Sequence, residues 1–334
     1  MSEETTEASL RAAILAAPED LGPRLALADW LCDRKDPLGD FLRVQCALAG
    51  VKDPQSRKGL RLREANLRNA NERAWTAPLR KFTTERAFHL GLLGHVGGTT
   101  KKLLPELPGI FAKEPVRSLT LLGVAGAKGV QELLATGLVR RLKRLKLTGP
   151  IGDEGVRALV SSDEVSGLES LVLTRVGMTA KGAALLASAR TLRGLKVLAL
   201  GGNALGDDGV RALTDAKSAL QVQTLYLTDT GLTNAGLQAL CRSELMKGLG
   251  LLTLTRTKVD DAGVEALAEA PEASGLRHLE LSGTGLTLRG ARALAASKYL
   301  SDLARLDIHG TPALRGKGLA LLKERFPRAL RASR

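Results

Sequence analysis

The chain has 334 residues, of which 44% are hydrophobic and only 3% aromatic, so a core must be built mainly from aliphatic side chains. Its three cysteines show neither paired nor metal-type spacing, and no run of about 18 apolar residues occurs, which excludes a disulfide scaffold and a membrane-spanning helix. The acidic start does not resemble a signal peptide, so a cytoplasmic location is expected.

The formal net charge of +14 is unevenly distributed along the chain. Residues 1–87 carry 15 basic and 13 acidic residues, so nearly all of the excess lies in residues 88–334. A basic surface favours an acidic partner, whether protein or nucleic acid, although solubility alone also explains it.

Residues 1–87 predict a small all-α domain. Apolar residues such as Leu27, Trp30 and Phe41 recur at helical spacing, and prolines or polar turns separate the segments. The expected helices cover residues 9–17, 23–32, 39–48 and about 56–73.

Residues 88–115 predict a cap, or irregular first repeat, on the segment that begins at residue 116. We expect an irregular strand near His95 and Val96, followed by a helix over residues 103–111. Such a cap would shield the open end of a stacked structure.

From residue 116 to the C-terminus a Leu-x-Leu phrase repeats. It begins at Leu119 and returns after steps of 26, 26, 27, 27, 27, 27 and 27 residues, the last time as Leu306-Asp307-Ile308. Within one unit, alternating apolar residues around Leu198 indicate a strand, and Val210 with Leu213 indicates a helix. Neither element can bury its apolar side alone, so residues 116–334 predict an α/β solenoid of about eight stacked units with a basic C-terminal tail.

This phrase resembles the leucine-rich repeat family, and specifically its ribonuclease-inhibitor type. The resemblance implies a horseshoe with a parallel inner sheet and outer helices. The polar position that follows each strand in that family is Asn203 here, and threonine occupies it in the later units: Thr230, Thr257, Thr284 and Thr311.

The N-terminal run from Pro18 to Gln45, with Pro23-Arg24-Leu25 and Asp40-Phe41-Leu42, resembles the bacterial repeat-companion domain that precedes leucine-rich repeats. The continuation Asn71-Glu72-Arg73-Ala74-Trp75 fits the same resemblance. It implies an architecture and brings no activity or catalytic residue with it.

Three acidic pairs stand where the helices of the repeats begin: Asp153-Glu154, Asp207-Asp208 and Asp260-Asp261. This register predicts helix capping more strongly than metal binding. His278 and His309 lie four residues apart in repeat register, about 13 Å, which is too far to share a metal. No catalytic, cofactor-binding or metal site is predicted.

A basic run occupies residues 140–146, where five of the seven side chains are cationic. It is either a site for an anion or acidic partner, or a solvated loop, which is the commoner role of charge runs.

Because strand side chains alternate, the residues between and before the paired leucines are expected to face the inner side of the sheet. This surface predicts a non-catalytic scaffold that binds another protein, an acidic one included, through Arg144, Lys146, Tyr226, Leu251, His278, Glu280, Arg305 and Asp307. Two alternatives remain: electrostatic binding of nucleic acid or another polyanion, and a GTPase-regulator role. The scarcity of aromatic residues for base stacking weighs against the first alternative.

Overall fold

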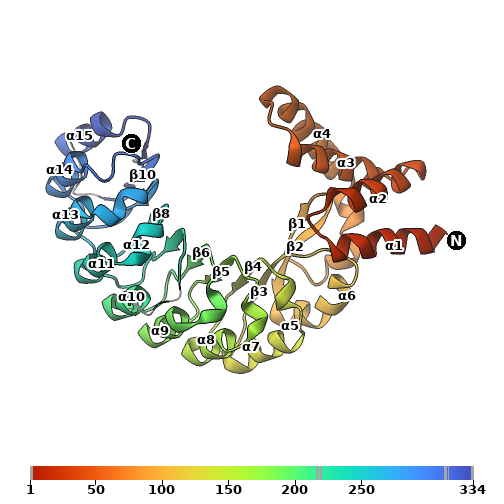
Figure 1. Ribbon diagram of the computed structural model, residues 1–334, viewed down its shortest axis with the longest axis horizontal. Coiled ribbons are helices and arrows are strands. Elements are labelled where there is room, and N and C mark those ends of the chain that lie inside the picture. The colour runs from red at the N-terminus through yellow and green to blue at the C-terminus, as the bar shows by residue number, and fades with distance from the viewer. Residues whose placement is uncertain (1–2, 216–217, 219, 312–313, 315, 332–334) are drawn as a thin grey trace. The chain divides into compact units, whose positions relative to one another are not determined.

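The computed structural model describes residues 3–215, 218, 220–311, 314 and 316–331 (Figure 1). The chain forms two compact units, Met1–Leu122 and Gly123–Arg334. Among the described residues, no helix is both long and apolar enough to cross a membrane.

The first unit begins with the four expected helices, which the structure confirms. Asp20, Asp36 and Asp53 each accept a hydrogen bond from a backbone N–H in the first turn of a helix, the arrangement of an N-cap. The helices are α1 (Glu3–Ala16), α2 (Leu21–Asp33), α3 (Pro37–Gly50) and α4 (Pro54–Trp75), and a short 3-10 turn, η1 (Ala77–Leu79), comes after them.

Several residues between Pro18 and Trp75 fix the packing of these helices. Gly39 lets α3 approach α2 closely, because a Cβ there would lie 2.7 Å from the Ala28 carbonyl oxygen. Phe41 packs against Trp75 of α4 in a tilted arrangement, with ring centroids 4.9 Å apart. The buried guanidinium of Arg24 donates to the carbonyl oxygen of Leu90 at 2.8 Å. Gly39, Phe41 and Arg24 therefore have structural roles.

The strands of the first unit are β1 (Glu85–His89), β2 (Leu92–Thr99) and β3 (Ser118–Leu122). β1 pairs antiparallel with β2 through a tight turn, whereas β2 and β3 are parallel and align Val96 with Leu119. The segment up to residue 87 is therefore not wholly helical. The irregular strand expected near His95 is present as β2, whose pairing with β1 shifts register between Ala87 and Phe88. The helix expected over residues 103–111 is divided into α5 (Thr100–Leu103), η2 (Leu104–Glu106) and α6 (Leu107–Phe111). Pro105 and Pro108 explain the division, since proline supplies no backbone N–H.

The second unit repeats a strand, a turn and a helix. Within it, the strands line the inner side of a curved stack and the longer helices line the outer side (Figure 1). Its strands are all parallel to their neighbours and follow chain order: β4 (Arg144–Leu147), β5 (Ser170–Leu173), β6 (Val197–Ala199), β7 (Thr224–Tyr226), β8 (Leu251–Thr253), β9 (His278–Glu280), β10 (Arg305–Asp307) and β11 (Leu330–Arg331).

The helices of this unit are α7 (Gly126–Ala135), α8 (Gly152–Val160), α9 (Ala180–Ser188), α10 (Gly206–Thr214), α11 (Asn234–Cys241), α12 (Glu244–Gly248), α13 (Asp261–Glu269), α14 (Leu288–Ala296) and α15 (Lys317–Arg325). The intervening 3-10 turns are η3 (Val139–Arg141), η4 (Asp163–Val165), η5 (Arg190–Leu192) and η6 (Pro271–Gly275). The longer helices of this unit pack against one another in chain order, and the short α12 packs against η6.

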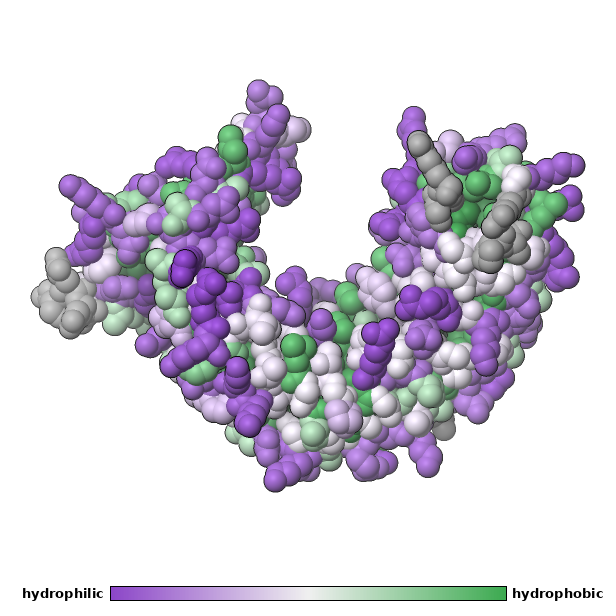
Figure 2. Space-filling model, turned by 180° about the vertical axis from the view of Figure 1, so that it is seen from behind, coloured by the Kyte–Doolittle hydropathy of each residue, from purple (hydrophilic) through white to green (hydrophobic). Residues whose placement is uncertain are grey.

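The paired leucines form the core of the repeats, as the period predicts. The first leucine of each pair aligns with its counterpart on the next strand, and each is at most 1% exposed: Leu145, Leu171, Leu198, Leu225, Leu252, Leu279 and Leu306. Burying one such side chain stabilises the fold by about 1.5–3 kcal/mol. Hydrophilic side chains project along the outer edge of the repeats, while residues of intermediate hydropathy fill much of the face shown in Figure 2.

The acidic pairs at the helix starts do not all act as caps, which corrects the prediction from sequence. Asp260 caps its own helix by accepting from Ala262 N at 2.9 Å. Asp153 and Asp207 instead accept hydrogen bonds from the helix start of the next repeat. Asp207 accepts from the backbone N–H of Thr233 at 2.8 Å and from its hydroxyl at 2.6 Å. The helices that contain Asp153 and Asp207 begin at Gly152 and Gly206, which have positive φ. The two aspartates do not cap these helices and instead bind the neighbouring repeats.

Candidate inner-face site

The inner face of the sheet carries the side chains that lie between the buried leucines. In β4, Leu145 and Leu147 are buried, whereas Arg144 is exposed and Lys146 is half-buried. The same alternation places Tyr226 of β7 half-buried beside the fully buried Leu225. The structure therefore presents a row of accessible side chains on a backbone fixed by the leucine ladder.

The eight predicted residues fall into two groups on this face. In the first group, Leu251, His278 and Arg305 align across three adjacent strands, and Glu280 aligns with Asp307. Tyr226 belongs to the same group, because Thr253 alone separates it from Glu280 along the row.

Arg144 and Lys146 form the second group, on β4. Lys146 aligns with Val172, Val172 with Ala199, and Ala199 with Tyr226 on successive strands. This is a separation of three strands, or about 14 Å at the usual strand spacing. The two groups could therefore contact one broad partner but not one small ligand.

Asp307 is occupied by its own neighbours. Its carboxylate accepts from Ser282 Oγ at 2.8 Å, from Arg305 Nη2 at 3.2 Å and from the His309 ring. Burial alone would raise the pKa of Asp307, but these hydrogen bonds, led by that of His309, lower it to about 2. Asp307 thus orients Arg305 and His309 and has little capacity left for a partner. In the described part of the chain, no group of three or more His, Cys, Asp or Glu is placed to hold a metal ion.

Two of the five cations in the basic run of residues 140–146, Arg140 and Lys143, pair with acidic residues. Glu164 accepts from Arg140 Nε at 2.7 Å, and Glu169 lies 3.0 Å from Lys143 Nζ. Hydrogen bonds from Lys196 and then Lys143 lower the pKa of Glu169 to about 2. These ion pairs favour the solvated loop over a dedicated anion site.

A hollow of about 350 Å³ opens on the inner face around Tyr226. Its size is in the range of small-ligand sites, and its walls come from four successive repeats. Glycine and alanine keep it open next to the tyrosine ring. The lining residues are Thr174, Arg175, Ala199, Gly201, Gly202, Tyr226, Thr228, Asp229 and Arg256.

Of these lining residues only Tyr226 was predicted as a site residue from sequence, and three of the others share an unusual backbone conformation. Arg175, Asp229 and Arg256 have φ angles of 55°, 55° and 53°, in the left-handed region. That conformation costs an L-residue about 1–2 kcal/mol. The sequence contained a signal for these residues. Glycine occupies this register position in the other repeats, and its replacement by a charged residue in three repeats could have marked the site.

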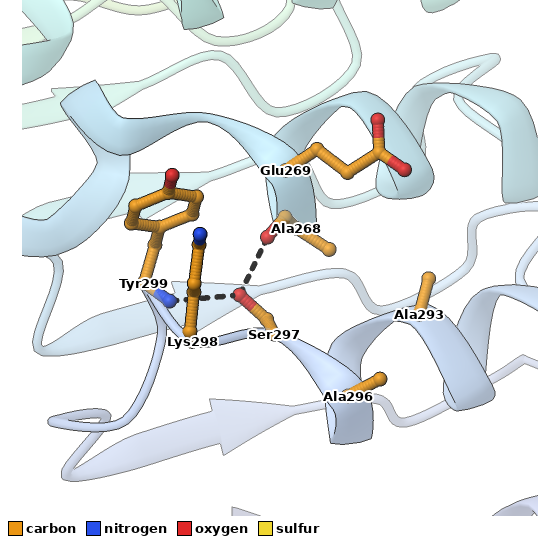
Figure 3. Close-up of a pocket in the computed structure, with 7 residues that line it drawn as sticks. All are labelled: Ala268, Glu269, Ala293, Ala296, Ser297, Lys298 and Tyr299. Carbon is orange, nitrogen blue, oxygen red and sulfur yellow. Dashed lines mark hydrogen bonds between the residues drawn. The ribbon is translucent and has the colours of Figure 1, made fainter.

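A second hollow, of about 420 Å³, lies on the helical side between α13 and α14 (Figure 3). The Lys298 ammonium lies 5.1 Å from the centre of the Tyr299 ring, and the two side chains run side by side at its edge (Figure 3). Ser297 is not a free nucleophile here, because its hydroxyl donates to the Ala268 carbonyl at 2.6 Å and accepts from two backbone N–H groups. Three alanines account for the hollow: Ala268, Ala293 and Ala296.

Comparison with known proteins agrees with the repeat architecture. The family described as Leucine Rich repeat matches residues 193–213, 222–241 and 276–295. Comparison with curated protein sequences gives no significant match.

Two solved structures are similar to the chain. The structure of Rad7 in complex with Elc1 from yeast aligns at a TM-score of 0.50 and 17% identity, covering 91% of this chain and 89% of that one. An internalin (inlF) from Listeria monocytogenes aligns at a TM-score of 0.38 and 16% identity, covering 65% of this chain and 60% of that one. The chain contains leucine-rich repeats, and its second unit is the solenoid of parallel strands and flanking helices that the leucine spacing predicts.

Proposed function

We propose that this chain is a non-catalytic scaffold that binds a partner protein on the inner face of its repeats. The observation that carries the proposal is a set of exposed or half-buried side chains, among them Arg144, Lys146 and Tyr226, over a buried leucine ladder, with a hollow at Tyr226. A rigid surface of this kind binds by shape complementarity and needs little ordering on association. Tyrosine is frequent among the residues that contribute most to such interfaces.

The proposed contacts are the two groups of inner-face residues. Asp307 contributes indirectly by holding Arg305 and His309, and the rest contact the partner: Arg144, Lys146, Tyr226, Leu251, His278, Glu280 and Arg305. A cytoplasmic location, a ribonuclease-inhibitor type of repeat and a bacterial repeat-companion identity for the N-terminal helices belong to the same proposal.

Binding of nucleic acid or another polyanion has less support. Arg140 and Lys143, at the densest basic stretch, already pair with Glu164 and Glu169. No feature of the inner face points to a GTPase-regulator role. The structure of Rad7 concerns a complex of two proteins, which agrees with the scaffold proposal at the level of the fold only.

Affinity capture from a native lysate of the source organism tests this proposal. We expect the double variant Lys146→Ala/Tyr226→Ala to recover at least about tenfold less of the partner than the wild type, because loss of a central tyrosine typically costs about 2 kcal/mol or more. The matched control is Lys298→Ala/Tyr299→Ala, which removes the same residue types from the helical side. Equal partner recovery by the inner-face variant and the wild type would contradict the proposal.

A further inference from the structure

One register position in the turns after the strands has positive φ throughout the second unit. The structure places glycine there in five repeats, with φ between 63° and 115°: Gly123, Gly149, Gly202, Gly283 and Gly310. Arg175, Asp229 and Arg256 take the same conformation without glycine's freedom. Three charged residues thus replace glycine at positions where glycine would be easier to accommodate.

These three residues all line the hollow around Tyr226. Residues held in an unfavourable backbone conformation concentrate at functional sites, where the surrounding structure maintains them. The backbone conformation of these three residues therefore supports a functional role for the hollow, in addition to the support from its shape.

Neighbouring glycines give the two arginines room. A Cβ on Gly202 would lie 2.4 Å from Arg175 Cγ, so the stem of Arg175 passes directly over that glycine. A Cβ on Gly283 would lie 3.1 Å from Arg256 Cγ. Side chains larger than glycine at these two positions would displace the arginines.

The charged groups of the hollow are available to a ligand. Within the part of the chain that the structure describes, no ion pair or side-chain hydrogen bond involves Arg175, Asp229 or Arg256, and all three are exposed. Two guanidinium groups outnumber the single carboxylate, and the hydroxyls of Tyr226 and Thr228 add hydrogen-bonding capacity. Guanidinium groups bind carboxylates through paired, directional hydrogen bonds.

We infer that this hollow anchors acidic side chains, Glu or Asp, from an extended segment of the partner protein. Arg175 and Arg256 lie three strands apart, about 14 Å, so each binds a carboxylate of its own, and Tyr226 packs against the segment between them. The inference rests on the proposed scaffold function and names the chemistry that the inner face recognises.

Fluorescence anisotropy with a fluorescein-labelled hexaglutamate peptide tests the inference. We expect Arg175→Gly/Arg256→Gly to bind this peptide at least about tenfold more weakly than the wild type, because two charge-assisted contacts, one to each of two carboxylates, are lost. Thermal unfolding should show no loss of stability, because glycine occupies the same position in sibling repeats. A weaker affinity in this variant cannot then be attributed to misfolding.

Matched variants and probes complete the experiment. Arg242→Ala, which removes an exposed cation at the end of α11, should leave the affinity unchanged. A hexaglutamine peptide should not bind.

The inference would be overturned by no binding of hexaglutamate to the wild type, by equal affinity in Arg175→Gly/Arg256→Gly, or by an equal loss in Arg242→Ala. Tighter binding of a single-stranded oligonucleotide through the same two arginines would also overturn it, in favour of a polyanion. The lysate capture is a separate readout, so loss of partner recovery in Lys146→Ala/Tyr226→Ala with unchanged peptide binding in the glycine variant would leave the scaffold standing without this anchor.

Discussion

Asn203 shows how much one side chain can do at a repeated position. Its Oδ1 accepts from the backbone N–H groups of Val176 and Met178 at 3.0 and 3.2 Å, and its Nδ2 donates at 2.7 Å to Leu173 and Leu200. The threonines at the equivalent position each donate a single bond to their own strand, as Thr230 does to Leu227 at 2.8 Å. Asn203 thus satisfies the turn of the preceding repeat as well as its own.

Replacing Asn203 by Thr should lower the free energy of unfolding by about 2–4 kcal/mol, because it leaves two buried N–H groups without an acceptor. Thr230→Val, which removes only one hydroxyl bond, should cost about 1 kcal/mol. Urea denaturation of both variants measures the difference. Similar losses in the two would show that Asn203 does not bridge the repeats.

The sequence predicted a polar residue at this position but not its bonds, because the bonded atoms lie in a different repeat, some 25–30 residues away. Arg175, Asp229 and Arg256 were missed for a related reason. They stand out by the positive φ angle of their turn, and the sequence indicates that angle only through the glycines at the same position in other repeats.

At the scale of elements, aspartates join successive helices. Asp153, Asp207 and Asp261 each bind the N-cap threonine of the following repeat. A glycine three residues after each threonine keeps the contact open, since a Cβ on Gly236 would lie 2.5 Å from Asp207 Oδ1. The helices were predictable from apolar spacing, but this contact was not, because a first-turn aspartate reads as a cap for its own helix.

Asp207→Ala should reduce the free energy of unfolding by about 1–3 kcal/mol at pH 7, through loss of charge-assisted hydrogen bonds to Thr233. Burial alone would raise the pKa of Asp207, but the bonds from Thr233 and Gly236 lower it below 3.8. Because the folded pKa is the lower one, the stabilisation is complete above about pH 4 and is lost as the pH falls through the folded value.

Denaturation at pH 7 and near pH 3 measures this effect, and the difference between wild type and Asp207→Ala should shrink at the lower pH. Asp208→Ala is the neighbouring control. Asp208 forms an exposed pair with Arg211, and such pairs contribute about 0–1 kcal/mol. A pH-independent effect of Asp207→Ala would contradict the assignment.

At the scale of the whole molecule, the leucine period predicted the stacked strands and their register, because each unit must bury its apolar side against the next. The helices before residue 76 were also predictable, from proline and aspartate at their starts. The antiparallel pairing of β1 with β2 was not, since it depends on contacts between segments that do not repeat. The sequence placed all eight candidate residues on inner-face strands, but it could not show that Asp307 is already saturated by its neighbours.

The most direct test of inner-face binding is photo-crosslinking of the partner from defined positions. A photoreactive residue at Val172, half-buried on β5 between Lys146 and Ala199, should form a covalent adduct with the bound partner. The same residue at Arg211, exposed on α10, should not. Adducts from Arg211 and none from Val172 would show that the partner binds the helical side and would contradict inner-face binding.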